Sequence, residues 1–174
     1  MTARPGLPRS PAPCVVYVDT NVLLDLPDLR DYRTSYPDVT LVILPEVLGE
    51  LNGLSRVPGQ NGQAARRSML ALHRVEHTPG VAVGVPVPGG TVSVMVPERH
   101  GVKGLSVDDA LLRAAQTLQR REARSVVGLF TRDGRIAERA LFSGIPCPLP
   151  RKGPITAPIA EAALKQLVAA ISSY

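Results

Sequence analysis

Four short segments of this chain each carry a carboxylate in a context that suits metal binding. The segments are VDTN at 18–21, PEVLGEL at 45–51, SVDDALL at 106–112 and TRD at 131–133. Their principal acids are Asp19, Glu50, Asp109 and Asp133. No Ser or Cys stands in a recognisable motif with a catalytic base, so any hydrolytic chemistry is expected to belong to these carboxylates.

Carboxylates cannot share a small site while all of them are ionised. Two unit charges about 4 Å apart repel by about 4 kcal/mol at an effective dielectric of about 20. A divalent cation removes this penalty, and ligands made only of oxygen favour Mg²⁺ or Mn²⁺ over zinc. Such a site suits phosphodiester hydrolysis, because one metal ion activates a water molecule and a second stabilises the leaving oxygen.

Asp19 and Asp133 each follow a run of apolar, partly β-branched residues that predicts a buried strand. Strands are predicted at 14–18, 41–44 and 125–130. Because helical segments alternate with them, the chain is expected to form an α/β fold with a parallel sheet covered on both faces. Ligands of such sheets bind at the carboxyl ends of the strands, where both acids are placed.

Helices are predicted at 45–55, 63–77, 107–121, 135–142 and 157–171. Pro45 suits the first turn of its helix, and Ser106 suits the N-cap of another. The valine-rich segments 81–87 and 91–96, joined by Pro-Gly-Gly, predict a β-hairpin insertion at about 81–97. The last helix is amphipathic and is expected to dock on the core through Ile159, Ala163, Leu167 and Ile171.

The predicted domain spans residues 14–150. A proline-rich leader at 1–13, expected to be disordered, precedes it, and a C-terminal extension at 151–174 carries the last helix.

At this point the segments resemble a known family. VDTNVLLD, PEVLGELNGL, SVDDALLRAA and LFTRDGRIAERALFSGIP, in this order and spacing, look like the four acidic signatures of PIN domains. The resemblance implies a single Rossmann-like, three-layer α/β/α domain with a central parallel sheet. It also implies cleavage of single-stranded RNA with Mg²⁺ or Mn²⁺. The hairpin and the loop through Lys103 resemble the longer PIN domains, including those joined to PhoH-type ATPases, rather than the compact toxins.

Matched to the family by position, Asp19, Glu50, Asp109 and Asp133 are the four metal-binding acids. Asn21 and Thr131 match polar residues that hold metal-bound waters or orient the acids. Asp108 is the weaker candidate of its pair, since adjacent helical residues point about 100° apart. Glu46 lies one turn before Glu50 and either supports it or faces solvent.

Each acid also has a simpler interpretation that does not involve a metal. Asp19 and Asp133 are good helix N-caps, and Asp109 suits a helix first turn because of the helix dipole. Glu50 is then a solvated helix residue. Their joint occurrence in the family's order favours the metal site.

The net charge of +5 favours a polyanionic partner, because many of the 15 acids fall inside the four segments and leave the rest of the surface more basic. The candidate nucleic-acid contacts are Arg66, Arg67, Arg74, Lys103 and Arg132. With 3% aromatic residues and no Trp, the chain is not expected to offer a base-stacking platform.

Other site classes find less support. The two cysteines form no CxxC pair, which excludes a cysteine-built zinc site. His73 and His77 are spaced for one helix face, but Arg74 stands where the zinc motif needs Glu. The chain has no signal-peptide pattern and no apolar run of the length a membrane span needs, so we expect a cytoplasmic protein without a membrane partner.

The expected function is therefore a metal-dependent endoribonuclease acting on single-stranded RNA. A structure-specific DNA nuclease, or a catalytically degenerate PIN module that binds RNA or protein, are the alternatives. A homodimer and an antitoxin or regulator protein are the other partners considered.

Overall fold

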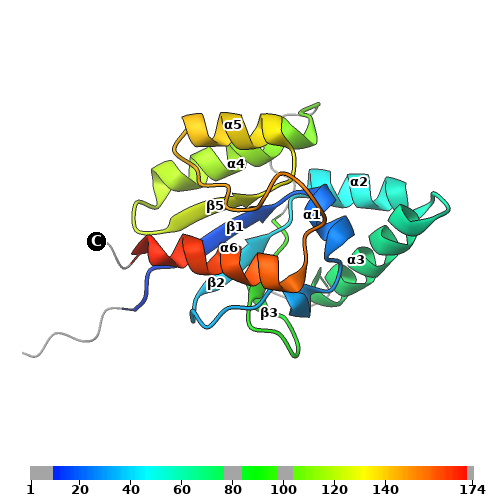
Figure 1. Cartoon of the computed structure of the whole chain (residues 1–174), viewed down its shortest axis with the longest axis horizontal. Coiled ribbons are helices and arrows are strands. Elements are labelled where there is room, and N and C mark those ends of the chain that lie inside the picture. The colour runs from blue at the N-terminus through cyan, green and yellow to red at the C-terminus, as the bar shows by residue number, and fades with distance from the viewer. Residues whose placement is uncertain (1–9, 77–83, 98–103, 172–174) are drawn as a thin grey trace, which may run out of the picture.

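The computed structural model describes residues 10–76, 84–97 and 104–171. These residues form a five-stranded sheet in the order β3-β4-β2-β1-β5, flanked by helices (Figure 1). The strands are β1 (Cys14–Val18), β2 (Val39–Val42), β3 (Val85–Pro86), β4 (Ser93–Met95) and β5 (Val126–Phe130). The helices are α1 (Thr20–Asp25), α2 (Pro45–Ser55), α3 (Gln60–Glu76), α4 (Val107–Arg121), α5 (Gly134–Phe142) and α6 (Ala157–Ala169), with a short 3-10 turn η1 (Leu29–Asp31).

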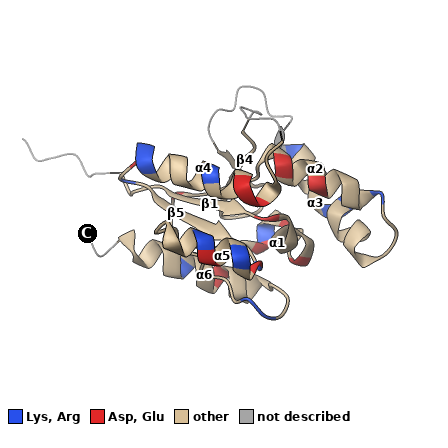
Figure 2. Ribbon diagram, turned by 90° about the horizontal axis from the view of Figure 1, so that it is seen from above, with Lys and Arg blue, Asp and Glu red and all other residues tan. Residues whose placement is uncertain are grey.

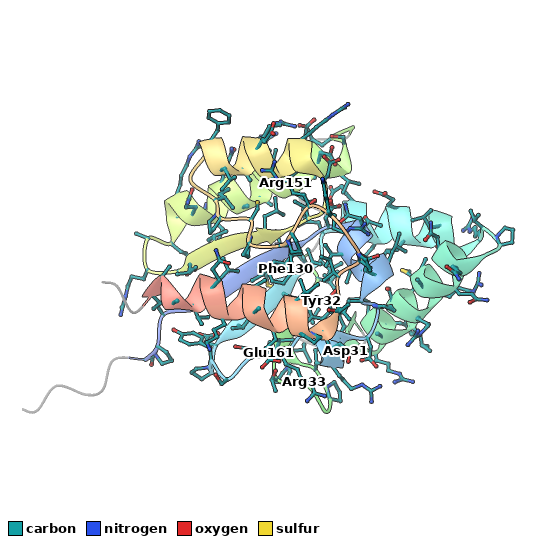
Figure 3. The ribbon with its side chains drawn as sticks, viewed as in Figure 1. Asp31, Tyr32, Arg33, Phe130, Arg151 and Glu161 are labelled. Atoms are coloured by element: carbon teal, nitrogen blue, oxygen red, sulfur yellow. The ribbon has the colours of Figure 1, made fainter. Side chains whose placement is uncertain are left out.

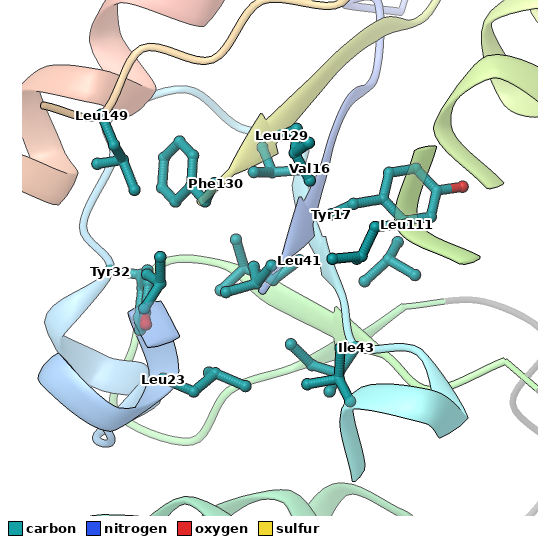
Figure 4. Close-up of a cluster of buried hydrophobic side chains, with 14 of the residues drawn as sticks. Val16, Tyr17, Leu23, Tyr32, Leu41, Ile43, Leu111, Leu129, Phe130 and Leu149 are labelled. Carbon is teal, nitrogen blue, oxygen red and sulfur yellow. The ribbon is translucent and has the colours of Figure 1, made fainter. Parts of the chain in front are cut away.

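Strand β1 is the centre of the sheet and pairs in parallel with β2 on one side and β5 on the other. Its residues are apolar on both faces because helices cover both, and Val16 and Val18 are fully buried. Figure 4 shows Val16 and Tyr17 among the side chains of Leu41 and Leu129 from the two neighbouring strands. The predicted α/β fold with a largely parallel central sheet is confirmed.

The second strand lies two residues earlier than the predicted 41–44. Leu44 is extended but serves as the N-cap of α2, and Pro45 occupies the first helical turn. The apolar run therefore continues into the connection to the helix, where Ile43 still donates a 3.0 Å backbone hydrogen bond to Met95.

The predicted hairpin is present and joins the main sheet. β3 pairs antiparallel with β4, and β4 pairs in parallel with β2. Gly89, with φ of 71°, supplies the left-handed residue of the turn between them. Val94 is fully buried, so the hairpin contributes to the core. The stretch 81–83 of the prediction lies outside the described residues.

Three predicted helices begin or end where their flanking residues dictate. α2 has its predicted bounds, and α4 has the expected Ser106 cap, whose hydroxyl accepts from the backbone N–H of Asp109. α5 begins at Gly134, directly after the capping residue Asp133. α3 begins three residues before the predicted start, at Gln60.

Helix α6 docks on the core, as predicted, and does so over β5. A Cβ atom at Gly128 would lie 2.7 Å from a methyl carbon of Leu167, so the glycine permits this close approach. The buried face differs in part from the prediction: Ala160 and Leu164 lie inside, whereas Ile159 and Ile171 are only half-buried. In Figures 1 and 2, α4 and α6 lie on opposite faces of the sheet, which gives three layers.

Both margins of the sheet have short or occupied edges. β3 has two residues and ends with Pro86, which has no backbone N–H. At the other margin, the backbone N–H of Leu129 in β5 donates to the carbonyl of Pro146, 3.0 Å away. Within the described part of the chain, no helix has the length and apolar character needed to cross a membrane.

Candidate active site

The site begins where β1 and β5 end next to each other. Their register pairs Val18 with Phe130, so the following residues, Asp19 and Thr131, are neighbours at the carboxyl edge of the sheet. The backbone N–H of Asp19 donates to the carbonyl of Phe130 at 2.9 Å, which extends the pairing by one residue. Because β2 and β5 lie on opposite sides of β1, the strand order reverses here, and such reversal points form ligand-binding crevices.

Asp19 is buried, with 5% of its surface exposed, and its carboxylate is fixed from three sides. Oδ2 accepts hydrogen bonds from the Thr131 hydroxyl at 2.7 Å and the Asn21 amide at 3.1 Å. Oδ1 accepts from the backbone N–H of Thr20 at 2.7 Å. The structure thus brings together Asp19, Asn21 and Thr131, three of the residues singled out in the sequence.

Asp133 is tied to the same cluster through the backbone. Its N–H donates to the Thr131 hydroxyl oxygen at 3.0 Å, while its own Oδ1 accepts from the N–H of Arg135 at 2.8 Å. Asp133 is therefore the N-cap of α5, as the simpler interpretation held. Capping occupies one carboxylate oxygen and leaves the other available.

The two acids of α4 point in different directions and have different partners. Asp109 accepts a 3.0 Å hydrogen bond from the Ser106 hydroxyl and forms a 2.8 Å ion pair with Arg139 of α5. The Arg139 hydrogen bond, and then that of Ser106, hold the pKa of Asp109 below its usual range. Asp109 is thus directed toward the helix cap and α5.

Asp108 is the α4 acid that acts on the buried carboxylate. Desolvation, followed by the charges of Asp133 and Asp109, raises its pKa. The charge of Asp108 in turn helps to raise the pKa of Asp19. The physical reason is the one that separated the two residues in the sequence: neighbours on a helix diverge by about 100°, and the capping interaction fixes which of them faces α5.

Glu50 reaches the site from α2. It is exposed, and its charge raises the pKa of Asp19, after the larger effect of burial and that of Asp108. α2 and α4 contact each other, and Figure 2 shows their acidic stretches on the same side of the molecule. Glu46 is half-buried in the first turn of α2, one turn before Glu50.

The donor set fits a hard divalent cation in its chemistry. All of the ligands on offer are oxygen atoms, and burial, together with the charges of neighbouring carboxylates, raises the pKa values of Asp19 and Asp108. Among the residues that the structure describes, no three Asp, Glu, His or Cys side chains converge as a preformed metal-binding group. The acids instead have separate partners: Thr131 and Asn21 for Asp19, the α5 backbone for Asp133, and Arg139 for Asp109.

Arg132, expected at the rim as a nucleic-acid contact, is turned toward α1 and the segment before α6. Its Nη1 lies 2.7 Å from Oδ2 of Asp25, which also accepts from the backbone N–H of Ile155 at 2.9 Å. The backbone N–H of Arg132 donates to Oδ1 of Asn21 at 3.2 Å. Arg132 is thus a structural link between Asp25 and the residues around Asp19.

The other expected cations lie on α3 or beyond the described residues. Arg66 donates to the carbonyl of Ser55 at 2.7 Å, and Arg67 and Arg74 are exposed. Lys103 and His77 lie outside the described part of the chain.

Two residues of this region, Asp25 and Arg139, were not predicted from the sequence. Asp25 contacts Arg132 across 107 positions, and Arg139 contacts Asp109 across 30. The only local signal for Arg139 is its spacing of four residues from Arg135, which puts both on one face of a helix.

Comparison with known proteins agrees with the geometry. The family model for the PIN domain matches residues 16–148, a span that starts in β1 and contains all four acidic segments. No curated protein matches the chain at a significant level. The match covers most of the chain and its whole acid set, and the chain belongs to the PIN-domain family.

Proposed function

We propose that this protein is a metal-dependent endoribonuclease that hydrolyses single-stranded RNA at the carboxylates around Asp19. The PIN-domain family is a family of nucleases. This chain has a carboxylate in each of the four segments that correspond to the acidic signatures of the family. The observation that carries the proposal is the state of Asp19: a buried carboxylate, at the point where the strand order reverses, with Glu50 and Asp108 close enough to raise its pKa.

Such an arrangement is unfavourable for the protein alone and favourable with a cation present. Desolvation and like charges both disfavour ionised Asp19, so a divalent cation is the natural counter-ion. We propose that Asp19, Glu50, Asp108 and Asp133 hold Mg²⁺ or Mn²⁺. Because the described acids do not converge on one point, we propose that Glu50, which is exposed, and Asp108 move when the metal binds.

When bound, the metal supplies charge neutralisation and activation of water for attack on phosphorus. The chain's own residues supply position. Thr131 and Asn21 fix the orientation of Asp19, and the Thr131 hydroxyl also fixes the start of the segment that carries Asp133. The N-cap bond to Arg135 then holds the Asp133 carboxylate at the head of α5.

The test is cleavage by the purified full chain of end-labelled single-stranded RNA, double-stranded RNA and single-stranded DNA, in Mg²⁺, Mn²⁺ or EDTA. We expect internal cleavage of single-stranded RNA with either metal, none in EDTA, and none by Asp19→Asn prepared in parallel. Equal cleavage by wild type and Asp19→Asn would overturn the assignment of the activity to Asp19. Cleavage confined to DNA would replace RNA with DNA as the substrate, and no metal-dependent cleavage of any substrate would overturn the proposal.

A further inference from the structure

We propose that Arg135 and Arg139, on the exposed face of α5, bind backbone phosphates of the nucleic acid beside the carboxylates. This inference rests on the proposed function and adds the residues that hold the polyanion. A cluster of acids repels phosphate, so a nuclease of this kind needs cationic side chains close to the acids.

Of the cations that the sequence favoured, Lys103 lies outside the described residues, and the others are engaged elsewhere or lie on α3. Arg132 is paired with Asp25, and Arg66 is bonded to the carbonyl of Ser55. The charge of Arg67 acts on Asp28, where it lowers the pKa. Arg139 of α5, by contrast, is paired with an acid of the site, Asp109.

Arg139 forms a 2.8 Å ion pair with Asp109 of α4, and the backbone N–H of Arg135 donates to the carboxylate of Asp133 at 2.8 Å, so both residues lie beside the acid cluster. They are four residues apart on a helix, a spacing that puts both on the same face. The N-cap bond from the Arg135 backbone to Asp133 fixes this face relative to the site.

Both guanidinium groups are available to a ligand. Among the described residues, the Arg135 side chain makes no hydrogen bond or ion pair, and the residue is exposed. Arg139 is 56% exposed and uses one nitrogen to pair with Asp109, which is itself 45% exposed. Exposed ion pairs are weak, and a guanidinium has five N–H donors, so Arg139 can bind a phosphate as well.

The polar face of α5 also carries one acidic residue, Glu138. Glu138 faces Arg151, at 3.5 Å, and Figure 3 shows Arg151 beside α5. The single acid of this helix is therefore partly neutralised by the chain that follows, and the face carries a net positive charge where the phosphates would lie.

The last turn of α4 offers a matched control. Arg120 and Arg121 are adjacent exposed arginines at the opposite end of that helix from Asp108. Arg121 lines a surface hollow with Pro13 and Ser125, which precede β1 and β5, so it lies at the amino edge of the sheet. Arg120→Gln/Arg121→Gln removes the same charge as Arg135→Gln/Arg139→Gln without touching the proposed surface.

The experiment measures the affinity of the full chain for a fluorescent single-stranded RNA oligonucleotide, in EDTA to prevent turnover, across a salt series. We expect Arg135→Gln/Arg139→Gln to weaken binding at least tenfold and to reduce the slope of log K against log salt by about 1.4, from two phosphate contacts at about 0.7 each. The control should change affinity less than twofold and leave the slope unaltered. Asp109→Asn, which frees Arg139 and removes a negative charge, should bind RNA more tightly than wild type.

Two results would overturn the inference. One is wild-type affinity and slope in the α5 double variant; the other is an equal loss in the α5 and control variants, which would show only a general effect of charge. Arg135→Gln alone, which breaks no contact within the described structure, guards against a folding artefact and should give about half the change in slope. Cleavage assays distinguish the phosphate-binding role of α5 from the proposed nuclease activity. If the wild type cleaves RNA and the α5 variants bind RNA normally, only the role of α5 is contradicted. If the wild type binds RNA through α5 but cleaves no substrate, only the nuclease activity is contradicted.

Discussion

The hydroxyl of Thr131 donates a 2.7 Å hydrogen bond to Oδ2 of Asp19, across 112 positions of sequence. The same hydroxyl oxygen accepts from the backbone N–H of Asp133. One small side chain therefore fixes both the buried carboxylate at the end of β1 and the start of the segment after β5.

Replacing Thr131 with Val removes this hydroxyl while keeping the shape of the side chain. We expect Thr131→Val to lower the free energy of unfolding by about 2 kcal/mol, because a buried carboxylate loses a donor. kcat for RNA should fall more than KM rises, because the residue positions Asp19 and does not bind the substrate. Thr131→Ser keeps the hydroxyl and should recover most of both losses. If Val and Ser behave alike in denaturation and in kinetics, the hydrogen bond has no positioning role.

Asp19→Asn should abolish cleavage without loss of the fold. The amide keeps nearly the same shape and removes a buried charge that Asp108 and Glu50 repel. In EDTA we expect a melting temperature equal to or above that of wild type, measured by circular dichroism, and a smaller rise on adding Mn²⁺. A variant that retains full activity would remove Asp19 from the site.

The stability of the metal-free protein should depend on pH through Asp19. Burial raises its native pKa above the ordinary value of 3.8, so the folded chain holds this proton more tightly than the unfolded chain. The contribution of Asp19 is therefore most favourable below about pH 4 and is lost as pH rises through the raised native pKa. Compared in EDTA from about pH 4 to about pH 7, the advantage of Asp19→Asn over wild type should grow as pH rises. If the stability advantage of Asp19→Asn shrinks over this pH range, the native pKa of Asp19 is not raised.

The two acids of α4 should differ in their effect on metal binding. Because Asp108 acts on Asp19 while Asp109 is paired with Arg139, Asp108→Asn should reduce the Mn²⁺-induced rise in melting temperature more than Asp109→Asn does. Thermal shift across a Mn²⁺ titration gives the comparison directly. The reverse order would favour Asp109 as the metal-binding acid of this helix.

Asp25 should matter for stability although it lies outside the acid cluster. Its Oδ2 binds both Arg132 and the backbone of Ile155, and the side chains of Asp25 and Arg132 are 17% and 32% exposed. Asp25→Ala should lower the free energy of unfolding by about 2 kcal/mol in urea denaturation, because Arg132 is left partly buried without its counter-ion. Adding Arg132→Met should recover part of that loss. Additive losses in the double variant would show that the pair does not interact.

Most of the fold could be predicted because its signals are local. β1 follows from five consecutive apolar residues, α2 from the proline at its start, and α4 from the serine that caps it. The register of β1 and β5 then places Asp19 beside Thr131 without further information. The pairing of the hairpin with β2 is a long-range contact, and it was not predicted because nothing within 84–97 indicates which strand lies next to the hairpin.

The directions of charged side chains were not predictable in the same way. The choice between Asp108 and Asp109 depends on Arg139, 30 positions after Asp109, and the orientation of Arg132 depends on Asp25, 107 positions before it. The hydrophobic periodicity of a sequence indicates which face of a helix or strand a residue lies on. It does not indicate which distant residue that side chain will contact.

The two margins of the sheet bear on how copies of this protein meet. An exposed strand edge is a template for another chain, and fibril growth or strand exchange proceeds by adding strands to it. Here one margin is a two-residue strand ending in Pro86, and at the other the outward N–H of Leu129 is already taken by Pro146. Copies that associate are therefore expected to do so through surfaces other than these strand edges, and a substitution that restores an N–H at position 86 would be the first place to look for polymerisation.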